Sequence, residues 1–436
     1  MVEWQHGFKI DRDKCTGRMT CMRACPTQAI RIKKGKAELL PELCIDCGSC
    51  LRVCPSGAIS ATTRSLKEVS KFKYKVAVPS AVLFGQFPPG ISPLHIVEGL
   101  KSMGFDEVWV MAKEIELVNL AIRNYMENWK GRLPLISSSC PVIVRLIQVS
   151  YPGMVEQLVH VETPRELAGR ELKREFSKEL GIPKEEIAAI YVTSCQAKTI
   201  SILEPAEGVR SELDGAIGIA DVYNGILSAA QSHKETNNDN QLSRDLLRSG
   251  AMLQWGMSEG QRQNLKDYNY MSMTGLSNII QVFDDIEKGK LRNLDFLECF
   301  SCWGGCVNGN LTVDNLYVAR SKLQRLLAEI QEKAPPIGKE VREYLNLESL
   351  HPRGPIRPRP IRGDRGNMKE RIKRIKDAEA VLASLPGLNC GLCGTPSCKA
   401  LSKDIVFGDA KKTDCIFYSE DRLEKLRAIY LEKNKP

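Results

Sequence analysis

Sixteen cysteines are the residues best able to do chemistry in this 436-residue chain, and their spacing sorts them into groups. The central group contains Cys302 and Cys306, which are separated by a Trp-Gly-Gly tripeptide. Thiolates at this spacing project from one tight turn, and paired glycines let the backbone approach an inorganic core held by the sulfurs. We therefore expect a metal centre at this turn.

Two isolated cysteines complete a four-thiolate set with this pair. Cys140 and Cys195 each follow an apolar run and small hydroxyl residues, which indicates a buried strand that delivers one thiolate at its carboxyl end. The carboxyl ends of parallel strands are where open α/β sheets place their ligand sites. Taken singly, each cysteine is better interpreted as a small buried hydrophobic residue, which is how lone cysteines usually behave.

Seven further cysteines lie in an internal repeat that covers residues 10–62. The second copy has the C-x2-C-x2-C-x3-C-P run, in which the fourth cysteine serves the other cluster. The stretch resembles a two-cluster ferredoxin domain. By the swapping rule the second cluster takes Cys44, Cys47, Cys50 and Cys25, and the first takes Cys15, Cys21 and Cys54.

The first of these clusters lacks a fourth cysteine, because Arg18 stands where that thiolate is expected. A guanidinium that is always protonated is a poor iron ligand. Three outcomes stay open: the cluster lacks an iron, a non-cysteine ligand such as His6 or Asp13 completes it, or the cluster is not assembled.

Four cysteines near the C-terminus form the pattern C-x2-C-x4-C-x16-C, and they are Cys390, Cys393, Cys398 and Cys415. Glycines follow the first two, and the pattern resembles a small [4Fe-4S] domain of electron-transfer and corrinoid-linked proteins of anaerobes. A structural zinc is the alternative, since zinc readily takes four thiolates. The long reach to Cys415 favours iron and sulfur. The remaining thiol, Cys299, is expected to pack rather than to bind metal.

The segments around Cys140, Cys195 and Cys302 to Cys306 resemble, in order, the three signature segments of the iron-only ([FeFe]) hydrogenase catalytic domain. The resemblance covers residues 74–326 and favours ligation at all four positions. In that family the cysteines hold a [4Fe-4S] cubane, and the last also bridges to a two-iron subcluster that carries carbon monoxide and cyanide. The resemblance implies that Cys306 is this bridging ligand and that Lys198 hydrogen-bonds a cyanide.

The chain departs from the family pattern at the predicted proton relay. Ser139 stands where the family has a cysteine that passes protons to the two-iron centre. The carboxylates of the usual proton path would fall at Val118 and Asn119. We therefore expect an altered relay, and this resembles the sensory branch of the family.

Three other departures concern the signature segments themselves. The family's methionines appear as Thr193 and Phe300, and residues 307–311 replace a glycine-rich tail. Together with Ser139, the lost tail favours a protein that binds only cubane clusters.

The order of apolar runs and amphipathic stretches from residue 74 onward is typical of α/β structure with parallel sheets. The predicted fold is an α/β hydrogenase-like catalytic domain, an N-terminal α+β ferredoxin-like domain and a small C-terminal iron-sulfur domain. The predicted boundaries are 1–66 for the ferredoxin-like domain, 67–350 for the catalytic domain, 351–368 for a basic Pro/Arg-rich linker and 369–436 for the C-terminal domain.

Net charge of +9 first suggests nucleic acid or an acidic partner, but the charge is concentrated in one segment. Residues 352–376 hold ten Lys and Arg residues and two acidic ones, without interleaved aromatic residues. Such a segment is typical of a solvated linker rather than a nucleic-acid site. No apolar stretch approaches the ~20 residues that span a bilayer. Many cysteines without a signal peptide indicate a reducing cytoplasm.

The sequence therefore predicts an iron-sulfur oxidoreductase that interconverts hydrogen with two protons and two electrons at a six-iron site. Its [4Fe-4S] clusters would relay electrons to a redox partner such as a ferredoxin or a signalling protein, and its turnover would be slow and sensory. The alternative is a non-catalytic protein that binds only cubanes, in cluster assembly or electron transfer. Lys198 favours the enzyme, because a cyanide partner has no purpose without the two-iron subcluster.

Overall fold

The computed structural model describes residues 5–232, 250–331, 350–352, 354–361 and 366–418. The chain divides into two compact units. The larger consists of Ile45–Cys47 and Ala61–Pro358, and the smaller of Met1–Cys44, Gly48–Ser60 and Arg359–Pro436. The predicted ferredoxin-like and C-terminal segments thus fall into one unit, and the predicted domain boundaries stay a prediction.

A four-stranded parallel sheet forms the first layer of the larger unit. Its order is β6-β5-β8-β9, and its strands are β5 (Tyr74–Pro79), β6 (Glu107–Val108), β8 (Ile187–Thr193) and β9 (Gly215–Gly218). Every residue of β8 is buried, as the continuous apolar run of a central parallel strand requires. The predicted α/β class with parallel sheets is confirmed.

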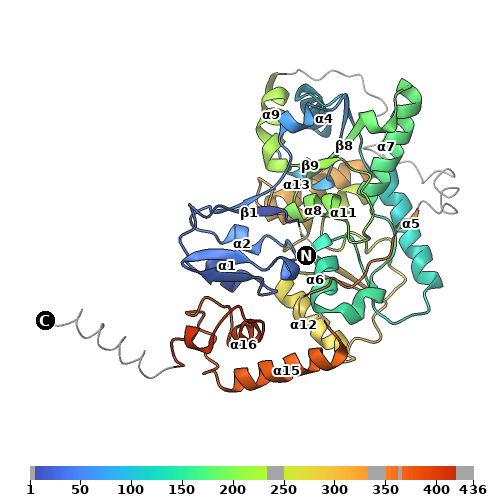
Figure 1. Cartoon of the computed structure of the whole chain (residues 1–436). Helices are drawn as coiled ribbons and strands as arrows, with labels where there is room; N and C mark the ends of the chain where they lie inside the picture. The colour runs from blue at the N-terminus through green and yellow to red at the C-terminus, as the bar shows by residue number, and fades with distance from the viewer. Residues whose placement is uncertain (1–4, 233–249, 332–349, 353, 362–365, 419–436) are drawn as a thin grey trace. The chain divides into compact units, whose positions relative to one another are not determined.

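Helices cover this sheet, and their bounds are α4 (Pro93–Ser102), α5 (Ala112–Asn128), α7 (Pro164–Leu180), α8 (Gln196–Leu203) and α9 (Ile219–Ser232). Figure 1 shows α4 and α9 side by side on one side of β8 and β9, with α7 on the other. A Cβ at Gly99 of α4 would lie 2.9 Å from the Cα of Ile226 in α9, so the glycine permits this close approach.

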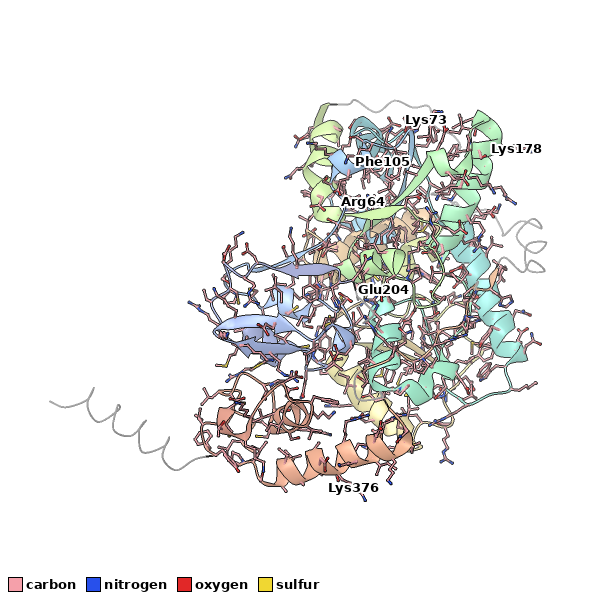
Figure 2. The ribbon with its side chains drawn as sticks, in the orientation of Figure 1. Arg64, Lys73, Phe105, Lys178, Glu204 and Lys376 are labelled. Atoms are coloured by element: carbon pink, nitrogen blue, oxygen red, sulfur yellow. The ribbon has the colours of Figure 1, made fainter. Side chains whose placement is uncertain are left out.

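A second parallel sheet, of order β10-β11-β7, lies in the same unit. Its strands are β7 (Leu135–Ile136), β10 (Tyr270–Thr274) and β11 (Phe296–Phe300), and the helices around it are α6 (Pro141–Ser150), α11 (Gly250–Trp255), α12 (Leu276–Glu287) and α13 (Leu316–Gln331). The strands that precede Cys140 and Cys195 therefore belong to different sheets. Figure 2 shows the charged side chains of Lys73 and Lys178 at the periphery, whereas Phe105 is buried.

Short elements form the ferredoxin-like part of the smaller unit. Strand β1 (Phe8–Ile10) pairs with β4 (Ile59–Ala61), and β2 (Ile30–Lys33) pairs with β3 (Lys36–Leu39) in an antiparallel hairpin. Two short helices, α1 (Thr20–Ala24) and α2 (Ser49–Arg52), carry cysteines of the repeat. This arrangement matches the predicted α+β ferredoxin-like segment.

The C-terminal part of the smaller unit contains α15 (Met368–Ala383) and α16 (Cys398–Val406). It packs on the β2–β3 hairpin, because the N–H of Ile32 donates to the carbonyl of Gly394 over 2.8 Å. A buried ion pair joins Arg31 of β2 to Asp404 of α16. The two cysteine-rich segments of this unit are therefore joined by both backbone and charged contacts.

Most described residues of the basic linker predicted at 351–368 are exposed, and only Gly354 and Arg359 among them are buried. In the larger unit, the carbonyls of Gly354 and Arg357 accept from His160 and Gln148, over 3.1 and 2.7 Å. In the smaller unit, Arg359 is only 5% exposed and donates to the carbonyl of Cys44 over 2.9 Å. Side-chain donors thus satisfy the carbonyls of two linker residues that each precede a proline. Within the described residues, no helix is long and apolar enough to cross a membrane.

Candidate metal centre

Cys140 reaches the centre of the larger unit on a short loop after β7. It is the residue before α6, and Pro141 occupies the first helical position, where the missing N–H loses nothing. The preceding hydroxyls satisfy local groups: Ser138 donates to the carbonyl of Val159 over 2.8 Å, and Ser137 donates to Ser139 over 3.0 Å. The polar run before Cys140 thus holds this loop in place.

Cys195 occupies the corresponding position after β8 and immediately before α8. The hydroxyl of Thr193 accepts from the N–H of Cys195 over 3.2 Å and donates to its carbonyl over 3.1 Å. Thr193, which stands where the family has a methionine, therefore fixes the backbone that carries the second thiol.

Cys302 and Cys306 flank a turn that follows β11, and both intervening glycines have positive φ, 74° at Gly304 and 100° at Gly305. A Cβ at Gly305 would lie 2.7 Å from the carbonyl oxygen of Gly256, and one at Gly304 would lie 2.6 Å from Leu316. We expected the glycines to let backbone approach an inorganic core. The turn conformation and the protein packing on either side already require both glycines, and the approach to an inorganic core stays a prediction.

The structure brings these four cysteines together. Burial raises the pKa of Cys195 to about 12; the Lys198 ammonium opposes this rise, and the thiolates of Cys302, Cys140 and Cys306 add to it. Neighbouring thiols resist ionisation next to one another, and a bound cation reverses this preference because thiolates are its ligands. The donor set therefore fits a cubane iron-sulfur cluster, although its occupancy stays a prediction.

Cys299 contrasts with these four. It lies within β11, it is 1% exposed, and burial raises the pKa of its thiol well above the usual value. It has the environment of a packed core residue, as predicted.

Lys198 lies in the first turn of α8, and its Nζ donates to the Sγ of Cys306 over 3.4 Å. Its ammonium also lies 5.7 Å from the ring centroid of Tyr191. Burial alone would lower the pKa of Lys198, but Cys306, Tyr191 and Cys195 raise it by a larger amount, so the side chain stays charged. A buried positive charge is thus directed at the predicted bridging cysteine.

A partly open space, which we call the inner cavity, adjoins this lysine. It has a volume of about 420 Å³ including its opening, and its lining includes Ser80, Ser139, Lys198, Thr163 and Arg165. The two hydroxyls and the ammonium provide hydrogen-bond donors beside Cys306, which fits a group that carries anionic acceptor ligands. The sequence reasoning missed Ser80, although its position directly after β5 is a typical ligand position.

Ser139 connects the inner cavity to a buried carboxyl group. Gln261 donates to the hydroxyl of Ser139 over 3.2 Å, and the N–H of Gln261 donates to Glu298 over 3.2 Å. Burial raises the pKa of Glu298. Val118 and Asn119, the positions predicted for the family's carboxylates, are both buried in α5 and carry no acid.

The other predicted ligand groups are also brought together in part. Burial raises the pKa of Cys21, and Cys15 and Cys54 contribute to this rise, so these three thiols are neighbours. Burial likewise raises the pKa of Cys415, with contributions from Cys393, Cys398 and Cys390. Both groupings are those that the spacing predicted.

The position in the first ferredoxin-type group where a fourth cysteine is expected is exposed to solvent. Arg18 is exposed, as is Asp13, which was one of two candidate replacement ligands. Which ligand completes this cluster stays a prediction.

The fold and the cysteine groups define an iron-sulfur protein built around an α/β domain with two parallel sheets. The chain belongs to the iron-only hydrogenase family: the model "Iron only hydrogenase large subunit, C-terminal domain" matches residues 73–244 and 204–310. A "4Fe-4S dicluster domain" model matches residues 8–55, and a model for an Fe-S cluster domain matches residues 385–417.

Curated relatives include hydrogenases and an assembly factor. The chain is 24% identical over 242 residues to "NADP-reducing hydrogenase subunit HndD" of Solidesulfovibrio fructosivorans, which covers 47% of this chain and 41% of the relative. It is 20% identical over 297 residues to "Probable cytosolic Fe-S cluster assembly factor GF22738" of Drosophila ananassae. This match covers 55% of this chain and 62% of the relative. The chain thus spans less than two thirds of the length of these relatives.

A solved structure shows the same fold. A variant of the [FeFe]-hydrogenase HydA1 from Chlamydomonas reinhardtii matches with a TM-score of 0.51 at 16% identity, over 68% of this chain and 98% of that one. The predicted hydrogenase-like α/β domain is therefore confirmed at the level of fold.

Proposed function

We propose that this protein is a hydrogenase-like redox protein that interconverts hydrogen with two protons and two electrons at a six-iron site. The observation that carries the proposal is the Nζ of Lys198 at 3.4 Å from Cys306, beside a cavity lined by Ser80 and Ser139. The bound group would supply the metal at which hydrogen is split. Cys140, Cys195 and their two partners would hold it.

The chain's own residues supply binding, orientation and exclusion of water. The four cysteines provide the ligands, Lys198 donates a charge-assisted hydrogen bond into the inner cavity, and the buried strands β8 and β11 keep the site dry. Because a serine hydroxyl titrates far above the pH at which a thiol does, Ser139 passes protons more slowly than the cysteine that the family has at this position. Slow turnover in a sensory role follows from this substitution.

Electrons would enter through the ferredoxin-type clusters. Within the larger unit, Asn310 donates to the carbonyl of Cys47 over 3.2 Å and to the side chain of Gln196 over 3.0 Å. Gln196 directly follows Cys195. These bonds join the backbone of a predicted ferredoxin-type ligand to the residue beside a central ligand, which supports electron transfer between them. A redox partner such as a ferredoxin would complete the chain.

A second candidate function is cluster assembly or electron transfer with cubanes alone. The relative from Drosophila ananassae is an Fe-S cluster assembly factor, and Ser139 departs from the hydrogenase signature in the way such a role permits. Cluster assembly or electron transfer with cubanes alone requires the four cysteines. It does not explain why the charged Lys198 lies beside the inner cavity.

Infrared spectroscopy after anaerobic loading with the six-iron group separates the two. We expect bands of metal-bound carbon monoxide and cyanide in the wild-type protein and their loss in Cys306→Ala. Cys299→Ala is the matched control, because this buried thiol lies on the same segment outside the proposed ligand set. Iron bound without carbonyl or cyanide bands in the wild type would leave the cubane-only function as the better one.

A further inference from the structure

A second and larger cavity in the larger unit has an ionic lining. This space, which we call the outer cavity, has a volume of about 780 Å³ including its opening. Five glutamates and four arginines line it. Arg210 is exposed and Glu207 partly so, which places one side of the cavity at the protein surface. These charged groups, beside apolar residues of the same lining, provide hydrogen-bond partners for water.

The outer cavity and the inner cavity share two lining residues, Thr163 and Arg165. Thr163 is the N-cap residue of α7, but its side chain makes no capping hydrogen bond. A threonine at this position ordinarily accepts from a backbone N–H of the first turn. Its buried Oγ1 has no hydrogen-bond partner among the described residues. The hydroxyl between the cavities is thus available to donate and accept.

Glu162 provides a titratable group that contacts the backbone of Thr163 and lines the same cavity. Its Oε1 accepts from the N–H of Thr163 over 2.9 Å, and its Oε2 accepts from Arg170 over 3.4 Å. Burial raises the pKa of Glu162 to about 7, the carboxylates of Glu166 and Glu207 add to the rise, and the Thr163 N–H and Arg170 oppose it. An acid that titrates near neutral pH is well suited to transfer protons.

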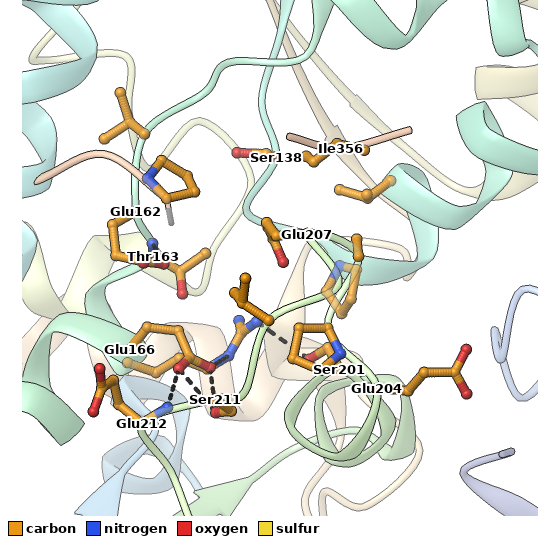
Figure 3. A pocket seen from close by; sticks show the side chains of 18 of the residues that line it. Ser138, Glu162, Thr163, Glu166, Ser201, Glu204, Glu207, Ser211, Glu212 and Ile356 are labelled. Carbon is orange, nitrogen blue, oxygen red and sulfur yellow. Dashed lines mark hydrogen bonds and ion pairs between the residues drawn. The ribbon is translucent and has the colours of Figure 1, made fainter. Parts of the chain in front are cut away.

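Glu166 has a fixed place in the same lining. Figure 3 shows its carboxylate next to Ser211 and Glu212, from which it accepts hydrogen bonds of 2.8 Å. Arg165 lies 3.9 Å from the same carboxylate and donates to Ser201 over 3.2 Å. These contacts hold Arg165 in place between the two cavities. We call Thr163 and Arg165, which separate the cavities, the partition. Proton transfer is then assigned to Glu162 and water rather than to Arg165.

We propose that the outer cavity is the proton channel of this chain, in which Glu162 exchanges protons with solvent and the Thr163 hydroxyl passes them to the inner cavity. This inference rests on the proposed function, because the inner cavity must hold a proton-consuming centre. It gives the chain a route that does not need acids at Val118 or Asn119.

The transfer balances at each step. The protonated carboxyl of Glu162 gives its proton to the hydroxyl or a water at the partition, which passes its own proton onward. The resulting carboxylate takes a proton from solvent through the outer cavity. Two such cycles supply the two protons of one hydrogen molecule, and the two electrons come from the reduced redox partner. In the oxidising direction every transfer reverses.

The first test reads the carboxyl group directly and needs no loaded site. Infrared difference spectra across pH should show a carboxylic acid band that disappears with a midpoint near pH 7. They are recorded in a Glu114→Gln background, because burial also raises the pKa of Glu114 to about 7. The band should be lost in Glu162→Gln and kept, with a shifted midpoint, in Glu162→Asp. Glu185→Gln removes an exposed carboxyl and should leave the band unchanged. Persistence of the band in Glu162→Gln would overturn the assignment.

The second test measures hydrogen turnover beside the infrared bands of the loaded centre. We expect turnover to fall roughly 10²-fold in Glu162→Gln and in Thr163→Val, with carbonyl and cyanide bands unchanged and Glu185→Gln at the wild-type rate. Wild-type turnover in Glu162→Gln with those bands intact overturns the channel alone. Absence of the bands in the wild type overturns the proposed function instead, and the two failures are therefore distinguishable.

Discussion

The carboxyl group of Glu114 is buried in the protein interior. It is 1% exposed in α5, and its Oε1 accepts from the indole of Trp109 over 3.2 Å. Burial raises its pKa to about 7; the bonds to its own backbone and to Trp109 oppose this. A neutral carboxyl in an apolar layer costs less free energy than an ionised one.

The consequence is a stability that falls with rising pH. Between about pH 4, where Glu114 titrates in the unfolded chain, and pH 7, the folded protein holds a proton that the unfolded chain has released. The free energy of unfolding therefore decreases over this range, by roughly 3 kcal/mol from this group. Glu114→Gln should flatten the slope.

Urea unfolding followed by tryptophan fluorescence at several pH values measures this effect. The indole of Trp109 contacts Glu114, so the signal reports on the right region. Glu185→Gln is the control, since an exposed carboxyl should leave the slope as it is. An unchanged slope in Glu114→Gln would show that this carboxyl titrates as it does in water.

At the scale of elements, the turn after β11 determines whether four thiols can meet. Strands from two different sheets deliver Cys140 and Cys195, and the remaining pair needs a backbone path that only glycine follows without strain at Gly305. The carbonyl of Gly256 packs against that position. The centre therefore depends on this turn as much as on its sulfurs.

Gly305→Ala should disrupt the central cluster without removing a ligand. The new Cβ would meet the Gly256 carbonyl at 2.7 Å, and a φ of 100° adds strain of about 1–3 kcal/mol. We expect lower iron content after anaerobic reconstitution and a lower melting temperature. Gly208→Ala is the control, because this glycine also has positive φ but open space around it. Equal iron content in the two variants would contradict the close-packing argument.

At the scale of the whole molecule, the chain's two cysteine-rich ends are joined in one unit by a charged pair. Arg31 and Asp404 are separated by 373 residues, both side chains are about 5% exposed, and the second bond between them measures 3.1 Å. Removing one partner of a buried pair leaves an uncompensated charge, whereas removing both leaves none.

Arg31→Met should therefore destabilise the smaller unit by about 3–5 kcal/mol, and the double variant Arg31→Met with Asp404→Leu should recover most of the loss. Thermal unfolding followed by the visible absorbance of the clusters measures both. Lys14→Met, at an exposed ion pair with Asp11, is the control and should have little effect. Equal destabilisation of the single and double variants would show that packing rather than charge joins the two segments.

The cysteine groups, the parallel α/β class and the family can all be read from the sequence. Ligand spacing and hydrophobic period are local properties, so they need no knowledge of distant contacts.

How those pieces combine depends on contacts that the sequence does not reveal. The separation of β7 and β8 into different sheets, the packing of the two cysteine-rich segments through Arg31 and Asp404, and the burial of Arg359 depend on contacts between residues far apart in sequence. The outer cavity could not be predicted from the sequence for the same reason. The pKa of Glu162 is raised by burial and by neighbouring charges, and the local sequence reveals neither.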